Sequence, residues 1–270
     1  MRWQPVSWPG SYRSAVSFSF DLDAESVWLA IDPANAEKPG ILSQGRYGPR
    51  VGVPLILDLL ERRGVTATFF VPGVVAEQHA ETVRAIVAAG HKLAVHGYTH
   101  DSPMKLSYSE EDDSLQRTRH ILEGFGARVS GYRSPAWEFS KNTLGLLEKH
   151  GFAYSSNMMD DIRPYQHESS SVVELPVQWI LDDGAHFWFD YSAWNKKIST
   201  PSEVREIWEA EFRGIHGLGG AFVLTMHPQV IGRPYRLEVL ERFIEFVQEH
   251  EDAWIAPCGD IASAFRDGAR

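Results

Sequence analysis

The chain has 270 residues, 43% of them hydrophobic and 23% charged, and this composition excludes disordered, collagen-like and coiled-coil proteins. Its 26 Lys and Arg residues and 36 Asp and Glu residues give a formal net charge of −10. An acidic surface repels phosphate backbones, so we expect no nucleic-acid partner.

The cysteine content and the hydrophobic runs indicate where the protein works. A single cysteine, Cys258, excludes an internal disulfide framework and a cysteine-only zinc site. Residues 1–20 include Pro5, Pro9 and Gly10 and contain no apolar run of the length found in signal peptides. No run approaches the roughly 18 apolar residues of a membrane span. We therefore expect a cytoplasmic protein without a membrane partner.

Strand and helix patterns alternate along the chain. The first strand is expected at residues 15–20, where Val16, Phe18 and Phe20 alternate with serines. Further strands are predicted at 66–71, 91–95, 129–132, 152–155, 172–179, 221–225 and 254–256. Helices are predicted at 51–63, 81–89, 109–124, 141–150, 202–216 and 235–249. A glycine stands between helix and strand at three of these joints, namely Gly64, Gly90 and Gly151.

This alternation predicts an α/β fold with a mostly parallel sheet and right-handed crossovers. No GxGxxG or phosphate-binding loop follows the first strand, which disfavours a nucleotide-binding doubly wound sheet. We therefore expect a (β/α) barrel of about seven parallel strands with helices outside. We expect one domain over 1–270, with a core at about 15–265, and we interpret the aromatic-rich stretch 183–201 as an inserted segment or an oligomer contact.

Carboxylates and imidazoles follow two of the predicted strands, at the edge where parallel α/β folds build their sites. Asp21 and Asp23 follow the first strand, which aims both side chains the same way. His96 and His100 follow the third strand and flank Gly97, which favours a loop over a helix. Because one Asp and two His residues suit a catalytic zinc with a fourth position for water, Asp23, His96 and His100 are candidate ligands.

Arg133 and His227 follow two further strands, and Pro135 and Pro228 end those strands by forcing the preceding residue into extended backbone. Taken singly, each polar residue has a structural reading: an Asp caps a helix, Arg133 is a surface cation and His227 is a core histidine. Polar sets at four separate strand ends are hard to attribute to coincidence, and together they predict a catalytic site.

These segments resemble the motifs of the polysaccharide deacetylases, a carbohydrate esterase family built on the nodulation-deacetylase homology domain. The resemblance extends over about 15–265 in the order of the family's motifs. The matching segments are FDLD at 20–23, HGYTH at 96–100, RSPAW at 133–137 and LTMH at 224–227. Two positions depart from the usual pattern, because Leu22 separates the two acids and Gly97 takes the place of a Ser or Thr.

The resemblance implies a role for each matched residue. Asp21 would be the general base, oriented by Arg133, and His227 would be the general acid. A zinc ion or another divalent transition metal would be held by Asp23, His96 and His100. The substrate-binding wall is expected from Pro135 and Trp137 of the third motif and from candidates for the fourth, namely Asp160, Asp161 and Trp179, with Asp182 as a further candidate.

In these two departures the chain resembles an intracellular branch of the family, which includes peptidoglycan-deacetylase-like proteins and hydrolases of cyclic imides and allantoin. That branch implies a distorted barrel and a homo-oligomer, commonly a tetramer. Our first hypothesis is metal-dependent deacetylation of an N-acetylated sugar or a related polysaccharide fragment. The alternatives are a cytoplasmic hydrolase of a small cyclic imide or allantoin-like amide, favoured by the missing signal sequence, and a catalytically silent scaffold that binds through its nine tryptophans.

Overall fold

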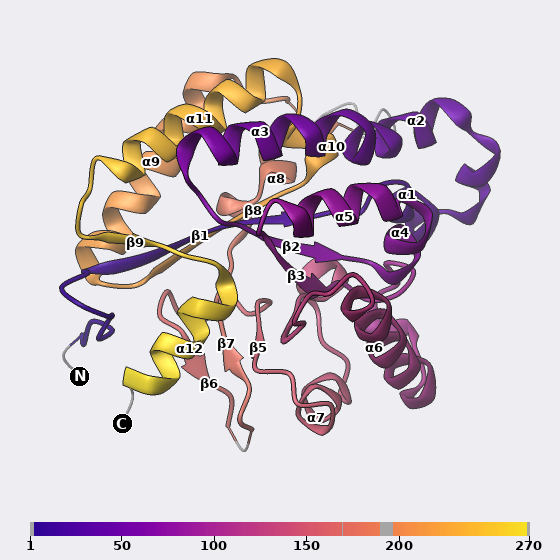
Figure 1. Cartoon of the computed structure of the whole chain (residues 1–270), viewed down its shortest axis with the longest axis horizontal. Helices are drawn as coiled ribbons and strands as arrows, with labels where there is room; N and C mark the ends of the chain where they lie inside the picture. Colours follow the sequence, from indigo (N-terminus) through magenta and orange to yellow (C-terminus); the bar gives the residue numbers. More distant parts are fainter. Residues whose placement is uncertain (1–2, 169, 190–196, 269–270) are drawn as a thin grey trace.

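The computed structural model describes residues 3–168, 170–189 and 197–268 of the chain. In this part of the chain, a curled sheet of nine strands is surrounded by helices (Figure 1). The strands are β1 (Ser14–Asp21), β2 (Thr68–Val71), β3 (Lys92–Val95), β4 (Gly131–Tyr132), β5 (Tyr154–Ser155), β6 (Tyr165–Gln166), β7 (Val173–Glu174), β8 (Ala221–Met226) and β9 (Ala253–Ile255). The α-helices are α1 (Ser26–Ile31), α2 (Pro39–Tyr47), α3 (Val53–Arg63), α4 (Gly73–Gln78), α5 (Ala80–Ala88), α6 (Tyr108–Glu123), α7 (Thr143–Lys149), α8 (Asp183–Phe187), α9 (Pro201–Leu218), α10 (Pro228–Ile231), α11 (Pro234–Gln248) and α12 (Cys258–Gly268).

The sheet has the order β6-β7-β5-β4-β3-β2-β1-β8, and β9 pairs with β1. β1 pairs with β8 along residues 15–20 and carries β9 at 14–16 and then β2 at 19–21. All pairs are parallel except β6 with β7. Between β7 and β8 the described residues form only one parallel bridge, Asp182 with Thr225, so the sheet is a half-barrel that is not closed by a ladder.

The predicted α/β class, with parallel strands inside and helices outside, is confirmed. Eight of the nine strands are in parallel pairs, close to the seven expected, and the antiparallel β6 was not predicted. The strand expected at 172–179 is limited to β7, because Pro176 has no N–H to continue the ladder and Trp179 begins a 3₁₀ helix. Of the expected insertion at 183–201, residues 183–187 form α8 and residues 190–196 lie outside the described part.

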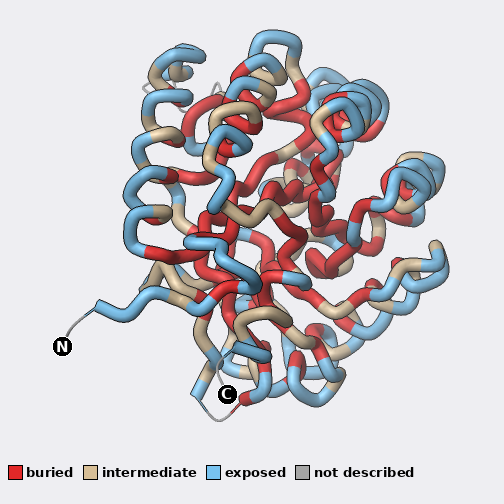
Figure 2. The backbone as a smooth tube through the Cα atoms, turned by 60° about the vertical axis from the view of Figure 1, so that its left-hand side comes forward, coloured by how far each residue is buried: buried red, intermediate tan, exposed pale blue. Residues whose placement is uncertain are grey.

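Alternate residues of β1 lie in two different environments. Val16, Phe18 and Phe20 belong to the main hydrophobic core, beneath α9 and α11. Ser17 and Ser19 point to the opposite face of the strand, yet they too are fully buried. The serine face therefore lines the interior of the curled sheet, and Figure 2 shows the buried backbone gathered there, with exposed segments outside it.

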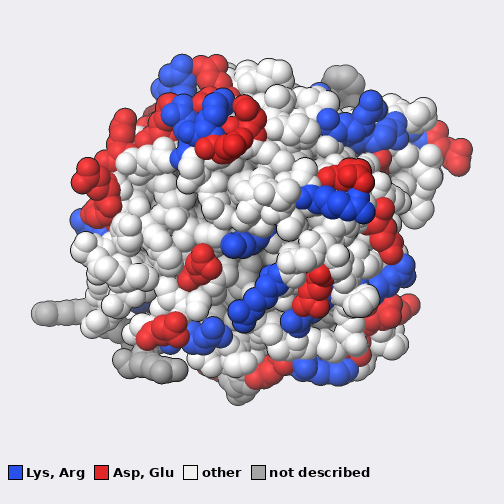
Figure 3. Space-filling view, in the orientation of Figure 1, with Lys and Arg blue, Asp and Glu red and all other residues white. Residues whose placement is uncertain are grey.

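The charge on the surface and the character of the helices are relevant to the expected absence of nucleic-acid and membrane partners. Acidic and basic side chains are interspersed on the face shown in Figure 3, without a continuous basic stripe. Within the described residues, no helix combines the length and apolar character needed to cross a lipid bilayer. The expected absence of a nucleic-acid partner stays a prediction.

His91, just before β3, gives the fold a pH dependence. Its side chain is buried, and Nδ1 accepts a hydrogen bond from the backbone N–H of Ala67 at 3.2 Å. Burial, with a smaller contribution from the charge of Lys92, lowers the pKa of His91 to about 4. The unfolded chain therefore binds a proton here near pH 6.5, whereas the folded chain does so only near pH 4.

We predict that His91 lowers the free energy of unfolding as the pH falls from about 6.5 to about 4, because the unfolded state takes up the proton first. Urea unfolding at about pH 7.5 and about pH 5 should show a smaller loss of stability in His91→Gln than in the unmodified chain. The exposed His120→Gln is the matched control, with an unchanged loss. Equal losses in all three proteins would contradict the prediction.

Candidate active site

The carboxyl ends of β1, β3, β4 and β8 meet at one edge of the sheet, as parallel strands require. Asp21 is the last residue of β1, His96 follows β3, Arg133 follows β4 and His227 follows β8. The side chains of Asp21, His96 and His227 line a cavity of about 370 Å³. The predicted residues that line it are Asp21, Asp23, His96, His100, Trp137, Trp179 and His227, joined by Asp182.

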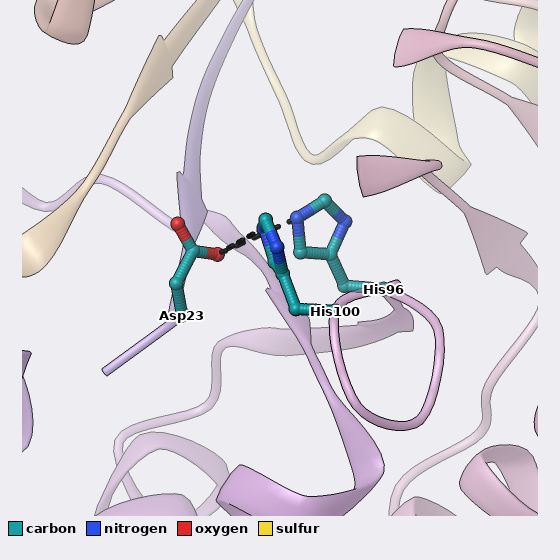
Figure 4. Close-up of side chains that lie close together, drawn as sticks. All are labelled: Asp23, His96 and His100. Carbon is teal, nitrogen blue, oxygen red and sulfur yellow. Dashed lines mark ion pairs between the residues drawn. The ribbon is translucent and has the colours of Figure 1, made fainter. Parts of the chain in front are cut away.

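Asp23, His96 and His100 face one another in this cavity (Figure 4). Asp23 Oδ1 lies 3.4 Å from His96 Nε2 and 3.5 Å from His100 Nε2. This oxygen is buried and has no hydrogen-bond partner in the described part of the chain. His96 Nδ1 donates to the backbone oxygen of Arg133 at 2.8 Å, so its Nε2 is left free to act as a ligand.

The electrostatics of the three residues suit a cation. Burial lowers the pKa of His100 to about 4, which keeps the ring neutral and its nitrogen available at neutral pH. Burial alone would raise the pKa of Asp23, but the neighbouring imidazoles hold it below the ordinary value. For His96, burial opposes the charged form, and Asp21 and Asp23 outweigh it to raise the pKa. A negative carboxylate between two imidazole nitrogens is the donor set of a divalent transition metal.

Arg133 lies behind Asp21 and does not line the cavity. Its guanidinium is fully buried, and Nη1 donates to Asp21 Oδ1 at 2.7 Å and to Ser19 Oγ at 3.0 Å. Nη2 donates to Ser156 Oγ at 2.9 Å. Asp21 Oδ2 does not take part in these bonds and lies 3.9 Å from His96 Nε2. One oxygen of Asp21 is thus fixed, and the other can accept a proton.

His227 is held by Asp183, a residue that the sequence reasoning missed. Nδ1–H of His227 donates to Asp183 Oδ1 at 2.6 Å, and its backbone N–H donates to Oδ2 at 3.0 Å. Burial opposes the charged imidazole, but Asp182 and Asp183 raise the pKa of His227 well above its ordinary value. Burial, together with Asp183, raises the pKa of Asp182 to about 7. His227 Nε2 lies 3.7 Å from Asp23 Oδ2, beside the candidate metal ligands.

The prediction that Asp160 and Asp161 form a wall of this site is corrected by the structure. Asp160 accepts a hydrogen bond from Tyr165 Oη at 2.8 Å, and Asp161 is paired with Arg163. Both line a different cavity, of about 520 Å³. Asp182, the further candidate, stands at the wall instead.

A local sequence pattern signals the position of Asp183, and one predicted residue, Pro135, lies away from the cavity. The DDG run after the LPVQWIL segment is a helix-start pattern, because Asp182 caps α8 by accepting from the N–H of Gly184 at 2.6 Å. This pattern places Asp183 at the first position of α8. Pro135, predicted to bind substrate, is buried beside Gly97 and does not line the cavity.

Tryptophans form the walls of the cavity. Trp137 has a φ of 55°, a left-handed conformation that bulky residues rarely adopt, and its ring centroid is 4.5 Å from that of Trp179. Trp179 is 53% exposed, at the mouth. Trp188 lies edge-on to His227, with centroids 6.1 Å apart, and stacks on Trp28 at 4.8 Å. Flat apolar surfaces therefore surround the charged groups.

Comparisons with known proteins bear on the family and the fold of this chain. Residues 46–155 match the family model described as polysaccharide deacetylase. A peptidoglycan deacetylase of Helicobacter pylori is 29% identical over 280 residues, which cover 93% of this chain and 95% of that protein. The crystal structure of a Mycobacterium smegmatis protein assigned as a polysaccharide deacetylase is 42% identical, with a TM-score of 0.93, over 98% of this chain and 96% of that one. The Puue allantoinase shares the fold, with a TM-score of 0.84 at 24% identity over 98% of this chain and 94% of its own.

We predict that Asp183→Asn lowers the pKa of His227, because a neutral amide replaces the carboxylate that favours the imidazolium. The measurement is an NMR titration of the histidine side chains in chelator-treated protein. Asp161→Asn, which removes a carboxylate outside the cavity, should leave the pKa of His227 unchanged. An unaltered titration in Asp183→Asn would show that Asp183 does not charge the ring.

Proposed function

We propose that this chain, which belongs to the polysaccharide deacetylase family, is a metal-dependent enzyme that removes N-acetyl groups from an amino sugar of peptidoglycan or a related oligosaccharide. The family consists of hydrolases of carbon–nitrogen bonds other than peptide bonds, and this chain is one of them. One observation carries the proposal: a candidate metal triad, a carboxylate fixed by arginine and a histidine fixed by aspartate surround one cavity.

The donor set in the cavity fits a divalent ion. Asp23 Oδ1 has no hydrogen-bond partner within the described residues, and both neighbouring Nε2 atoms lie within 3.5 Å of it. We infer that Asp23, His96 and His100 hold the ion, with zinc as the first candidate because nitrogen and oxygen ligands are mixed. When bound, such an ion would polarise the amide carbonyl and lower the pKa of a water molecule toward about 7.

The side chains of this protein would move the protons. Asp21 Oδ2 takes the proton of the attacking water, while Arg133 holds Oδ1 in place. His227 gives a proton from Nε2 to the leaving nitrogen, because Asp183 occupies Nδ1 and favours the charged ring. Water adds to the acetyl carbon, the carbon–nitrogen bond breaks, and the products are a free amino group and acetate.

The tryptophan walls support a sugar as the substrate. Trp137, Trp179 and Trp188 present flat apolar faces around the polar groups, the usual composition of a small-molecule site. The Helicobacter pylori relative is a peptidoglycan deacetylase that aligns with nearly the whole chain, which favours an N-acetylated sugar of the cell wall.

A second candidate substrate is a small cyclic amide. The cavity, at about 370 Å³, is near the lower end of the range of roughly 300 to 1,000 Å³ for ligand sites. Val27 and Ile31 add an apolar side to it, which suits a compact ring better than a long polysaccharide. The fold shared with the Puue allantoinase is compatible with this reaction.

We predict that the purified protein holds about one equivalent of a divalent transition metal and that His96→Ala loses most of it, because one of three ligands is removed. Metal content measured by mass spectrometry tests this. His120→Ala, which removes an exposed imidazole on α6, is the control and should keep the metal. Absence of metal from the unmodified protein after purification with added zinc would overturn the ligand set.

We predict that Asp21→Asn and His227→Asn reduce turnover by about 10² to 10⁴ while the metal content stays unchanged, because each change removes one proton transfer. Turnover is measured on peptidoglycan, acetylated chitooligosaccharides and succinimide. Release of acetate supports the sugar substrate, and opening of succinimide alone supports the cyclic amide. Asp161→Asn should retain normal turnover. Near-normal turnover of Asp21→Asn would remove Asp21 from the role of base.

A further inference from the structure

A second cavity, of about 480 Å³, lies next to the catalytic pocket and shares Trp188 with it. Trp28, which stacks on Trp188, lines the second cavity only. The side chains that bear on its chemistry are Phe187, Gln229, Arg233, Tyr235 and Arg236. None of them takes part in the proposed reaction.

Gln229 gives this cavity an unused hydrogen-bonding group. It lies on α10, two residues after His227, and is only 4% exposed. Neither Oε1 nor Nε2 has a hydrogen-bond partner among the residues that the structure describes. A buried amide without partners is costly. Neither atom is exposed in this conformation, so the side chain of Gln229, which lines the cavity, would have to rotate before its donor and acceptor reach a molecule there.

Arg233 and Arg236 give the cavity a positive charge. Neither forms an ion pair with a carboxylate in the described ranges 3–168, 170–189 and 197–268. Neutral groups hold them instead: Arg233 stacks on Tyr47 at 3.5 Å, and Arg236 donates to the Val230 carbonyl at 3.0 Å and to Tyr235 Oη at 2.9 Å. Both guanidinium groups are therefore fixed, and within the described ranges no carboxylate pairs with either charge.

The backbone adds to this positive potential. Arg233 occupies the N-cap position of α11, a helix of 15 residues, without a capping bond from its side chain, and Arg236 lies in the first turn. The N-terminal end of a helix attracts negative charge through its macrodipole and its free N–H groups. In a chain with a net charge of −10, a cavity at a helix N-terminus with two arginines that pair with no described carboxylate attracts anions.

We propose that this cavity is a binding site for a small organic anion with a flat apolar body. Its acidic group would pair with Arg233 and Arg236, whose planar forks suit carboxylate and phosphate oxygens. Its ring would lie against the exposed Tyr235, and a neutral polar edge would bond to the Gln229 amide after that side chain rotates toward the cavity. The site is separate from the catalytic one, so the inference stands without the proposed reaction.

The test is calorimetric titration of the full chain with benzoate, benzamide and benzamidine, which share a ring and differ in charge. We expect benzoate to bind at least about tenfold more tightly than benzamide, and benzamidine not to bind. Phenyl phosphate, titrated in parallel, shows which acidic group is preferred. Arg233→Gln should weaken benzoate binding by about tenfold or more. Arg242→Gln is the control, because Arg242 is on the same helix, is exposed and pairs with Glu238.

A second variant guards against loss of folding. Gln229→Glu keeps the size of the side chain and adds a negative charge, so it should also abolish benzoate binding while circular dichroism confirms a folded protein. Benzoate binding that is equal in these variants and the unmodified chain overturns the proposal. So does binding that is lost in His96→Ala but kept in Arg233→Gln, because the anion would then be in the catalytic pocket. Absence of benzoate binding together with a change of oligomeric state in Arg233→Gln, by sedimentation, would make the cavity a subunit contact and also overturn it.

Discussion

The site depends on one buried charge, the guanidinium of Arg133. Removing a cation from water costs several kcal/mol, and only well-placed partners compensate for that cost. Arg133 has them in Asp21, Ser19 and Ser156, all inside the curled sheet. Its backbone oxygen also accepts the Nδ1–H of His96. The same residue therefore fixes the proposed base through its side chain and one proposed metal ligand through its main chain, so that the two cannot be placed independently.

The incomplete closure of the barrel positions the other half of the site. Between β7 and β8 the chain runs past the sheet edge, and the Asp182–Thr225 bridge is its contact with β8. The bridge places Asp183 beside His227, where the two carboxylate oxygens accept from the ring and from the backbone N–H. A continuous strand in the gap would point alternate residues away from the site, so the irregular path allows adjacent acids to reach the same histidine.

The sequence predicted the parts of this structure that depend on local pattern. Period-two alternation predicts the strand β1, and Gly64, which has a left-handed φ of 63°, predicts the end of a helix. Both patterns are local and do not depend on tertiary contacts. The fold class followed from these and is confirmed. The DDG pattern can place Asp183 at a helix start, but the contacts of Asp183 and Trp188 with His227 could not be predicted, because they form from about 40 residues away and across a gap in the sheet. The prediction for Asp160 and Asp161 was wrong for the same reason. No local sequence pattern shows whether the acidic pair at 160–161 or the pair at 182–183 lies at the catalytic cavity.

α10 links the catalytic pocket to the second cavity, and its packing decides how they can influence each other. The His227 carbonyl accepts from the N–H groups of Val230 and Ile231 at 2.7 and 2.9 Å, so the histidine and the helix form one unit. Gly52 lies so close to α10 that a Cβ there would be 2.2 Å from the Pro228 oxygen, which leaves the helix no room to move in that direction. A molecule that binds Gln229 thus meets a fixed backbone. Its influence on the catalytic pocket would pass through Trp188, which lines both cavities and lies edge-on to His227, or through α8, which carries Phe187 at the second cavity and Asp183 at His227.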